Sequence, residues 1–114
     1  MENCYTEQHE EIKRKLCDSE SFLSGVEEAS TIFAMLGEPN RMKIILALMK
    51  GELCVYHICE ITGGKQSAVS QHLRKLKDNR IVKSRKEGNQ VLYSICDEHI
   101  YTIVQTALEH SRCL

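Results

Sequence analysis

Apolar residues recur at helical spacing along the first half of the chain, in blocks that glycine and proline separate. The first block runs from Val26 to Leu36 and stops at Gly37, and the second begins at Pro39 and continues through Leu48. Proline is favoured in the first turn of a helix, where its missing N–H is not needed, and glycine is favoured just past a helix end. The pattern therefore predicts two consecutive helices.

A shorter pair of helices follows, joined by two glycines. The pattern predicts a helix over residues 55–62, closed by Gly63 and Gly64, and another over residues 66–77 with its apolar side chains on one face. This order of helix, tight glycine turn and helix is typical of a helix-turn-helix.

Beyond Asn79 the apolar period changes from 3.6 to 2, which favours β-strands. Residues 81–84 and 91–95 flank a turn at residues 86–89, so we predict a β-hairpin with a basic tip. A last helix is predicted to begin near Asp97, whose carboxylate can cap it, and to run to the end of the chain.

The net charge of −1 conceals a strongly basic block. Residues 65–90 carry eight basic and two acidic side chains, a surplus of +6, so the remaining residues carry −7. A local basic block on an acidic molecule is typical of a surface that meets phosphates, although a solvated charged face is the alternative.

Helix-turn-helix followed by a hairpin is the order of elements in a winged helix, whose second helix enters the major groove while the hairpin contacts the neighbouring backbone. We therefore predict a mainly helical fold with a small β-hairpin. The side chains predicted to contact DNA, each with a plain solvent-facing role as its alternative, are Gln66, Ser67, Ser70, Gln71, His72, Arg74 and Lys75 of the helix and Arg85, Lys86, Asn89 and Gln90 of the wing.

The last helix carries potential metal ligands at both ends, Asp97 and His99 at its start and His110 and Cys113 at its close. Two residues eleven positions apart share a helix face but lie about 16 Å apart along the axis, so one helix cannot bring both histidines to one ion. Two antiparallel copies could, which predicts a homodimer with two symmetry-related sites. The alternative is a helix cap, two solvent-facing imidazoles and a terminal thiol.

Length and composition limit the class of protein. The 114 residues suffice for one domain, with residues 1–24 expected as an N-terminal arm and residues 25–114 as the DNA-binding and dimerisation domain. Residues 1–20 are polar and weakly periodic, as in a mobile arm or a short helix. We find neither a membrane span nor a signal peptide, which leads us to expect a cytoplasmic protein. Six cysteines in a reducing compartment indicate metal ligands or redox thiols.

From about Ser30 to Cys113 the chain resembles the ArsR/SmtB family of dimeric winged-helix repressors. The motifs that carry this resemblance are Leu36-Gly37-Glu38-Pro39-Asn40-Arg41, Glu52-Leu53-Cys54-Val55, Ser67-Ala68-Val69-Ser70-Gln71-His72-Leu73, Arg85-Lys86-Glu87-Gly88 and Tyr93. The resemblance implies that a homodimer binds an operator before genes of metal efflux, sequestration or detoxification and is released by its inducer. It also implies that Ser67, Ser70, Gln71 and His72 lie on the recognition helix.

Two inducer sites of that family have counterparts in this chain. The C-terminal site matches at Asp97, His99 and His110 and departs at Cys113, whose thiolate keeps Zn²⁺ binding feasible and improves the fit to Cd²⁺, with Pb²⁺ and Co²⁺ as further candidates. The second site matches at Cys54, but Tyr56 stands where another cysteine is expected. The candidate ligands of this second site are Cys54, His57 and, from the arm of the other subunit, Cys4, His9 and Cys17.

We therefore expect a metal-sensing repressor that Zn²⁺ or Cd²⁺ releases from operator DNA. The alternative function is a repressor of the same fold that responds to oxidants or reactive sulfur through its thiols. A metal-dependent enzyme is disfavoured because the chain has no His-Glu-x-x-His motif and no phosphate loop, and a simple metal buffer leaves the basic helix unexplained. Cys59 and Cys96 match no ligand position and are predicted to be core thiols.

Overall fold

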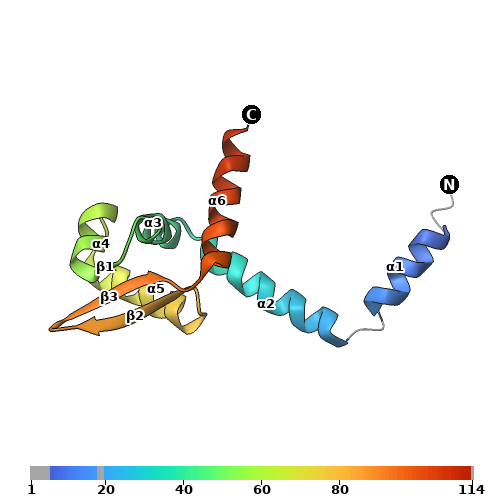
Figure 1. Ribbon diagram of the computed structural model, residues 1–114, viewed down its shortest axis with the longest axis horizontal. Helices are drawn as coiled ribbons and strands as arrows, with labels where there is room; N and C mark the ends of the chain where they lie inside the picture. The colour runs from blue at the N-terminus through green and yellow to red at the C-terminus, as the bar shows by residue number, and fades with distance from the viewer. Residues whose placement is uncertain (1–5, 18–19, 114) are drawn as a thin grey trace. The chain divides into compact units, whose positions relative to one another are not determined.

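The computed structural model describes residues 6–17 and 20–113 of the chain (Figure 1). Its elements, in chain order, are α1 (Glu7–Cys17), α2 (Glu20–Leu36), α3 (Pro39–Leu48), β1 (Leu53–Cys54), α4 (Val55–Thr62), α5 (Gln66–Asp78), β2 (Val82–Glu87), β3 (Gln90–Ile95) and α6 (Glu98–Arg112). The winged helix-turn-helix predicted from the sequence is confirmed.

The chain divides into two compact units, Met1–Thr31 and Ile32–Leu114, with the boundary inside α2. In the first unit α1 forms the short helix that was one of the two expectations for this stretch, and it has no buried residue. Helix α2 begins well before the predicted start at Val26. The division into an arm of residues 1–24 and a domain of residues 25–114 stays a prediction.

Short-range signals set the ends of the helices in the second unit. Glu38 caps α3 by accepting the backbone N–H of Arg41 at 2.8 Å, and Pro39 follows in the first turn. Gly63 ends α4 with φ of +75°, in the left-handed region that glycine adopts without steric cost. The predicted helices over residues 55–62 and 66–77 are confirmed, the second with one residue more.

The sheet has three antiparallel strands in the order β1-β3-β2. Strands β2 and β3 pair from Val82 opposite Ile95 to Glu87 opposite Gln90, so the hairpin turn has two residues rather than the predicted four. Gly88 occupies the first of them with φ of +61°. Strand β1, which the sequence pattern did not predict, places Leu53 opposite Tyr93 and Cys54 opposite Leu92. The hairpin extends beyond the helices as a wing (Figure 1).

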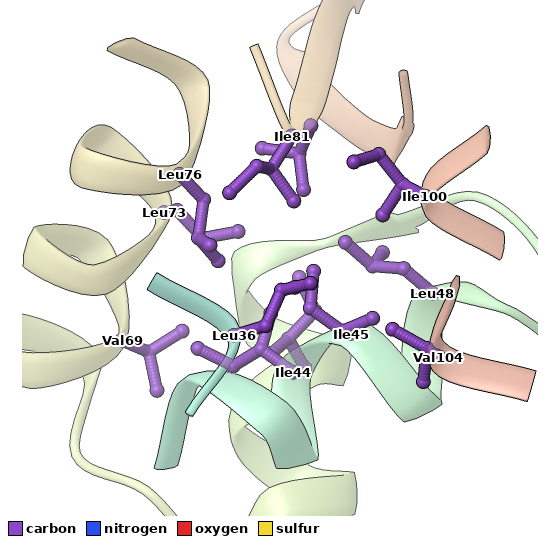
Figure 2. Packing of buried hydrophobic residues seen from close by; sticks show 12 residues of the cluster. Leu36, Ile44, Ile45, Leu48, Val69, Leu73, Leu76, Ile81, Ile100 and Val104 are labelled. Atoms are coloured by element: carbon purple, nitrogen blue, oxygen red, sulfur yellow. The ribbon is translucent and has the colours of Figure 1, made fainter. Parts of the chain in front are cut away.

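One apolar core joins the helix-turn-helix to the last helix. Leu73 of α5 and Val104 of α6 belong to the same cluster of buried side chains, which Figure 2 shows around Ile45 of α3. The cluster comprises Leu36, Ile44, Ile45, Leu48, Ile58, Val69, Leu73, Leu76, Ile81, Val82, Ile100 and Val104. The buried residues of α5 and α6 thus belong to one continuous core.

Candidate nucleic-acid interface and metal half-sites

Helix α5 carries seven of the predicted DNA contacts, and all but one of them are exposed. Val69, Leu73 and Leu76 are buried on its inner face. The predicted contacts are exposed, apart from the half-buried His72, and comprise Gln66, Ser67, Ser70, Gln71, Arg74 and Lys75. Because burying one stripe of a helix leaves the opposite stripe in solvent, α5 presents amide, hydroxyl and cationic groups of the kinds that bind base edges and phosphates.

The turn before α5 holds the recognition helix close to α4. A Cβ atom on Gly64 would lie 2.8 Å from Cγ2 of Val69, closer than such atoms pack, so only glycine fits this position without a shift. Val69 is itself 3% exposed and belongs to the core. The glycine pair therefore positions α5 as well as ending α4.

His72 lies on the flank of α5 that faces α3 and α4. Its side chain lines a recess of about 140 Å³ together with Asn40 and Lys43 of α3 and Thr62 of α4. The pKa of Glu38 is held below its usual value, first by the hydrogen bond from the backbone N–H of Arg41 and further by the charges of His72 and Arg41.

The wing presents its predicted contacts differently. Lys86, Asn89 and Gln90 are exposed near the hairpin turn. Arg85 instead binds two carboxylates: its Nε and Nη2 donate to Glu52 at 2.9 and 2.8 Å, and Nη2 also lies 2.8 Å from Glu87. The hydrogen bonds from Arg85 lower the pKa of Glu52, and Glu52 followed by Glu87 raises the pKa of Arg85. The positive charge of Arg85 is therefore already neutralised by carboxylates of the same chain.

Two candidate ligands meet at the start of α6. Asp97 caps the helix, and its Oδ1 accepts the backbone N–H groups of His99 at 2.9 Å and of Ile100 at 3.2 Å. Nδ1 of His99 lies 3.5 Å from the same oxygen, and both side chains are exposed. These hydrogen bonds, that from Ile100 foremost, lower the pKa of Asp97. The carboxylate is thus ionised near neutral pH, as a metal ligand must be.

The other two candidate ligands lie at the far end of α6. His110 and Cys113 are exposed, and Cys113 has a free thiol. Within residues 6–17 and 20–113 no three His, Cys, Asp or Glu side chains cluster closely enough to hold a metal ion. A single chain therefore has two of the predicted ligands at each end of α6 and does not bring the four together.

The second candidate site has one close pair. Sγ of Cys54, at the position before α4, lies 3.3 Å from Nδ1 of His57 in the first turn of that helix. His9 and Cys17 are exposed on α1 in the other unit, and Cys4 lies outside the described residues. The pair could supply one thiolate and one imidazole nitrogen to an ion.

The two remaining cysteines differ from each other. Cys59 is half-buried and packs against the core, as predicted. Cys96 is also half-buried, but it lines an open groove with Lys83 and Tyr101 and is not part of the core cluster, so its prediction as a core thiol was wrong. It follows a strand end, where the alternation of apolar residues no longer determines burial.

Comparisons with known proteins place this combination of elements in a family. Residues 38–84, from α3 into β2, match the family described as "Bacterial regulatory protein, arsR family". A cadmium resistance transcriptional regulatory protein, the CadC homolog of Staphylococcus aureus, is 40% identical over 86 residues, which cover 75% of this chain and 71% of that protein. The chain belongs to the ArsR/SmtB family. The SmtB homolog of Synechocystis, a transcriptional repressor, is 31% identical over 102 residues, 90% of this chain and 77% of that one.

Membership of the ArsR/SmtB family makes the protein a DNA-binding transcriptional regulator and not an enzyme. The fold agrees with that of a homodimeric winged helix-turn-helix DNA-binding domain from Mycobacterium bovis, with a TM-score of 0.77 at 24% identity over 82% of this chain and 86% of that one. No helix in the described part of the chain is long and apolar enough to cross a membrane.

Sequence reasoning missed the role of Glu52. This residue and Arg85 are 33 positions apart, Glu52 just before the edge strand β1 and Arg85 on the other edge strand β2, so no helical or hairpin spacing links them. The unpredicted strand β1 is what brings Glu52 to the wing. The only local signal for this contact in the sequence is the position of Glu52 directly before the apolar pair Leu53 and Cys54.

Proposed function

We propose that this ArsR/SmtB protein is a homodimeric repressor that leaves its operator when Zn²⁺ or Cd²⁺ binds between the last helices of the two chains. The observation that carries the proposal is the distribution of ligands on α6, with Asp97 and His99 at one end and His110 and Cys113 at the other. Two antiparallel helices would complete two identical four-ligand sites, the number that a closed tetrahedral zinc site requires.

Exposed apolar side chains support the dimer. In the second unit Phe33 of α2 is 60% exposed and Tyr101 of α6 is 44% exposed, and in the first unit Leu23 is 71% exposed. Large apolar side chains left in solvent on several helices indicate surfaces that a partner covers. The homodimeric state of the Mycobacterium bovis domain with this fold supports the same arrangement.

The ligand chemistry favours borderline and soft divalent ions. Oδ1 of Asp97 accepts the capping hydrogen bonds, which leaves Oδ2 for a metal ion. Imidazole and thiolate ligands suit Zn²⁺, and the thiolate of Cys113 favours Cd²⁺ more than a carboxylate in its place would. The naming of the CadC relative for cadmium resistance supports Cd²⁺, and Pb²⁺ and Co²⁺ are further candidates. Since the thiol must lose its proton and the imidazoles must be neutral, affinity should fall below about pH 7.

The Cys54 and His57 pair is proposed as part of a second site. Its 3.3 Å separation supports a shared ligand, and the arm of the partner chain, with Cys4, His9 and Cys17, is the proposed source of the remaining donors. The same pair is the strongest support for the alternative function, a thiol-responsive repressor, because it places a free thiol 3.3 Å from an imidazole nitrogen.

The switch would act through the shared core. Ile100 and Val104 of α6 belong to the same buried cluster as Leu73 and Leu76 of the recognition helix. A metal ion that fixes α6 against its partner would therefore alter the spacing of the two α5 helices across the dimer. By thermodynamic linkage, DNA must weaken metal binding by the factor by which metal weakens DNA binding.

A titration with labelled operator tests the proposal. Zn²⁺ and Cd²⁺ should each release the wild-type protein, His110→Ala should abolish the release, and His57→Ala should preserve it. Unchanged DNA affinity at saturating metal would reject the proposal. A response that Cys54→Ser removes while His99→Ala and His110→Ala retain it would favour the thiol-responsive alternative.

A further inference from the structure

The interaction between Glu52 and Arg85 is the most extensive ion pair in the described part of the second unit. Two parallel hydrogen bonds join the carboxylate to Nε and Nη2 of the guanidinium, and Glu87 binds Nη2 from the same strand as Arg85. Bidentate pairs between arginine and a carboxylate are among the strongest and most directional hydrogen-bonded contacts in proteins.

The register shows what this pair spans. Leu92 of the central strand β3 lies opposite Arg85 on one side and opposite Cys54 on the other, and Glu52 stands just before β1. The strands β1 and β2 occupy the two edges of the sheet. The ion pair therefore reaches across the central strand and ties the base of the wing to the segment that leads into α4.

The charges around Arg85 do not favour a phosphate there. One guanidinium faces two carboxylates, so this group of three side chains has a net charge of −1. A DNA phosphate that approaches the guanidinium must either displace the carboxylates or lie beside them against like-charge repulsion. Lys86, the next residue of the wing, has no ion-pair partner among the residues that the structure describes, and is the better placed cation.

We propose that Glu52 restrains the affinity of the wing for DNA by occupying the guanidinium of Arg85 in the unbound protein. This inference rests on the proposed contact between wing and DNA. It assigns to Glu52 a role in setting affinity, and it implies that Arg85 contributes little to DNA binding until the carboxylate is removed.

The test measures binding to a fluorescein-labelled duplex of mixed sequence at several salt concentrations, because phosphate contacts do not depend on sequence. Glu52→Gln should bind severalfold tighter than wild type, with a slope of log Kd against log salt steeper by up to about 0.9, the value for one additional neutralised phosphate, because Glu87 still competes for the guanidinium. Arg85→Lys keeps the charge but cannot form the bidentate pair, so it should also bind more tightly.

Two controls separate this effect from general electrostatics. Glu60→Gln removes an equal charge from α4 at an exposed carboxylate and should change affinity less than Glu52→Gln. In an Arg85→Ala background, Glu52→Gln should have almost no effect. Unfolding midpoints of all variants should stay close to wild type, because the group is exposed.

The outcomes are distinguishable. An equal gain from Glu52→Gln with and without Arg85 would overturn the inference in favour of a long-range charge effect. Weaker binding by Arg85→Lys or Glu52→Gln would overturn it by showing that the ion pair holds Arg85 ready for phosphate. If no variant and no wild-type protein bound DNA, the proposed function itself would fail.

Discussion

Nδ1 of His99 lies 3.5 Å from Oδ1 of Asp97, the same oxygen that accepts the backbone N–H of His99. The cap that starts α6 and the first proposed metal half-site therefore share one carboxylate. A metal ion that binds the carboxylate of Asp97 would therefore act on the first turn of α6. Ile100, whose backbone N–H also donates to Oδ1, is buried in the core.

Two substitutions of Asp97 should separate its roles. Asp97→Asn keeps an oxygen that can cap the helix but loses the charged ligand, so metal affinity should fall at least tenfold while the urea midpoint changes little. Asp97→Ala should lower both the metal affinity and the urea midpoint, because alanine, unlike asparagine, cannot cap the helix. Zinc competition titrations and urea unfolding at fixed protein concentration would measure the two effects. Equal metal affinity for Asp97→Asn and wild type would exclude this carboxylate as a ligand.

Alanine at two glycines should have opposite effects on stability. At Gly64 the added Cβ would lie 2.8 Å from Cγ2 of Val69, so Gly64→Ala should cost about 1–3 kcal/mol and weaken DNA binding by shifting α5. At Gly25 within α2 nothing lies within 4 Å, so Gly25→Ala should stabilise by about 0.5–1 kcal/mol. Chemical unfolding checks both, and a stabilised Gly64→Ala would refute the close packing of the turn.

Acid should destabilise the protein through its capping carboxylates. The backbone N–H of Arg41 foremost lowers the pKa of Glu38 in the folded state, so ionised Glu38 stabilises the fold above its unfolded pKa of about 4.3. That contribution is lost as pH falls through the lower folded pKa. Urea midpoints measured from pH 7 to pH 3 should therefore fall less steeply for Glu38→Gln than for wild type. Parallel curves would contradict the assignment.

Base contacts and phosphate contacts on α5 should differ in their dependence on salt and sequence. Lys75→Ala should weaken binding to all duplexes alike and reduce the salt slope by about 0.9. Gln71→Ala should leave the salt slope unchanged but reduce discrimination between operator and altered sequences by about 1–3 kcal/mol. Fluorescence anisotropy with matched duplexes would measure both, and the same behaviour in the two variants would argue against α5 as the recognition helix.

The helices of the second unit were predictable because their signals are local. Pro39 and Gly63 mark ends that depend on backbone chemistry at a single residue, and the apolar stripe of α5 follows directly from helical spacing. Strand β1 was not predictable in this way. Its two residues show no alternation of their own, and only pairing with Leu92 and Tyr93 makes them a strand.

The same difference between local and long-range signals applies to the candidate sites. The exposure of the polar side chains of α5 follows from the burial of its apolar ones, so the sequence was sufficient for that surface. The pairing of Arg85 with Glu52 depends on the position of β1 beside β3. The spacing of residues within a single helix or strand therefore cannot predict it. Whether His99 and His110 lie close together depends on a second chain. The spacing within one chain shows only that a single helix cannot bring both histidines to one ion.

Subunit complementation tests the intersubunit site most directly. A heterodimer of His99→Ala and His110→Ala chains has one site that lacks both histidines and one that retains all four ligands, if each ion lies between two chains. With Cys54→Ser in both chains, which removes the proposed second site, the account predicts one tightly bound Co²⁺ or Zn²⁺ per heterodimer, with tetrahedral cobalt absorption, and none for either mutant homodimer. A heterodimer that binds no ion more tightly than the mutant homodimers would contradict it, because sites built within single chains could not be restored by mixing.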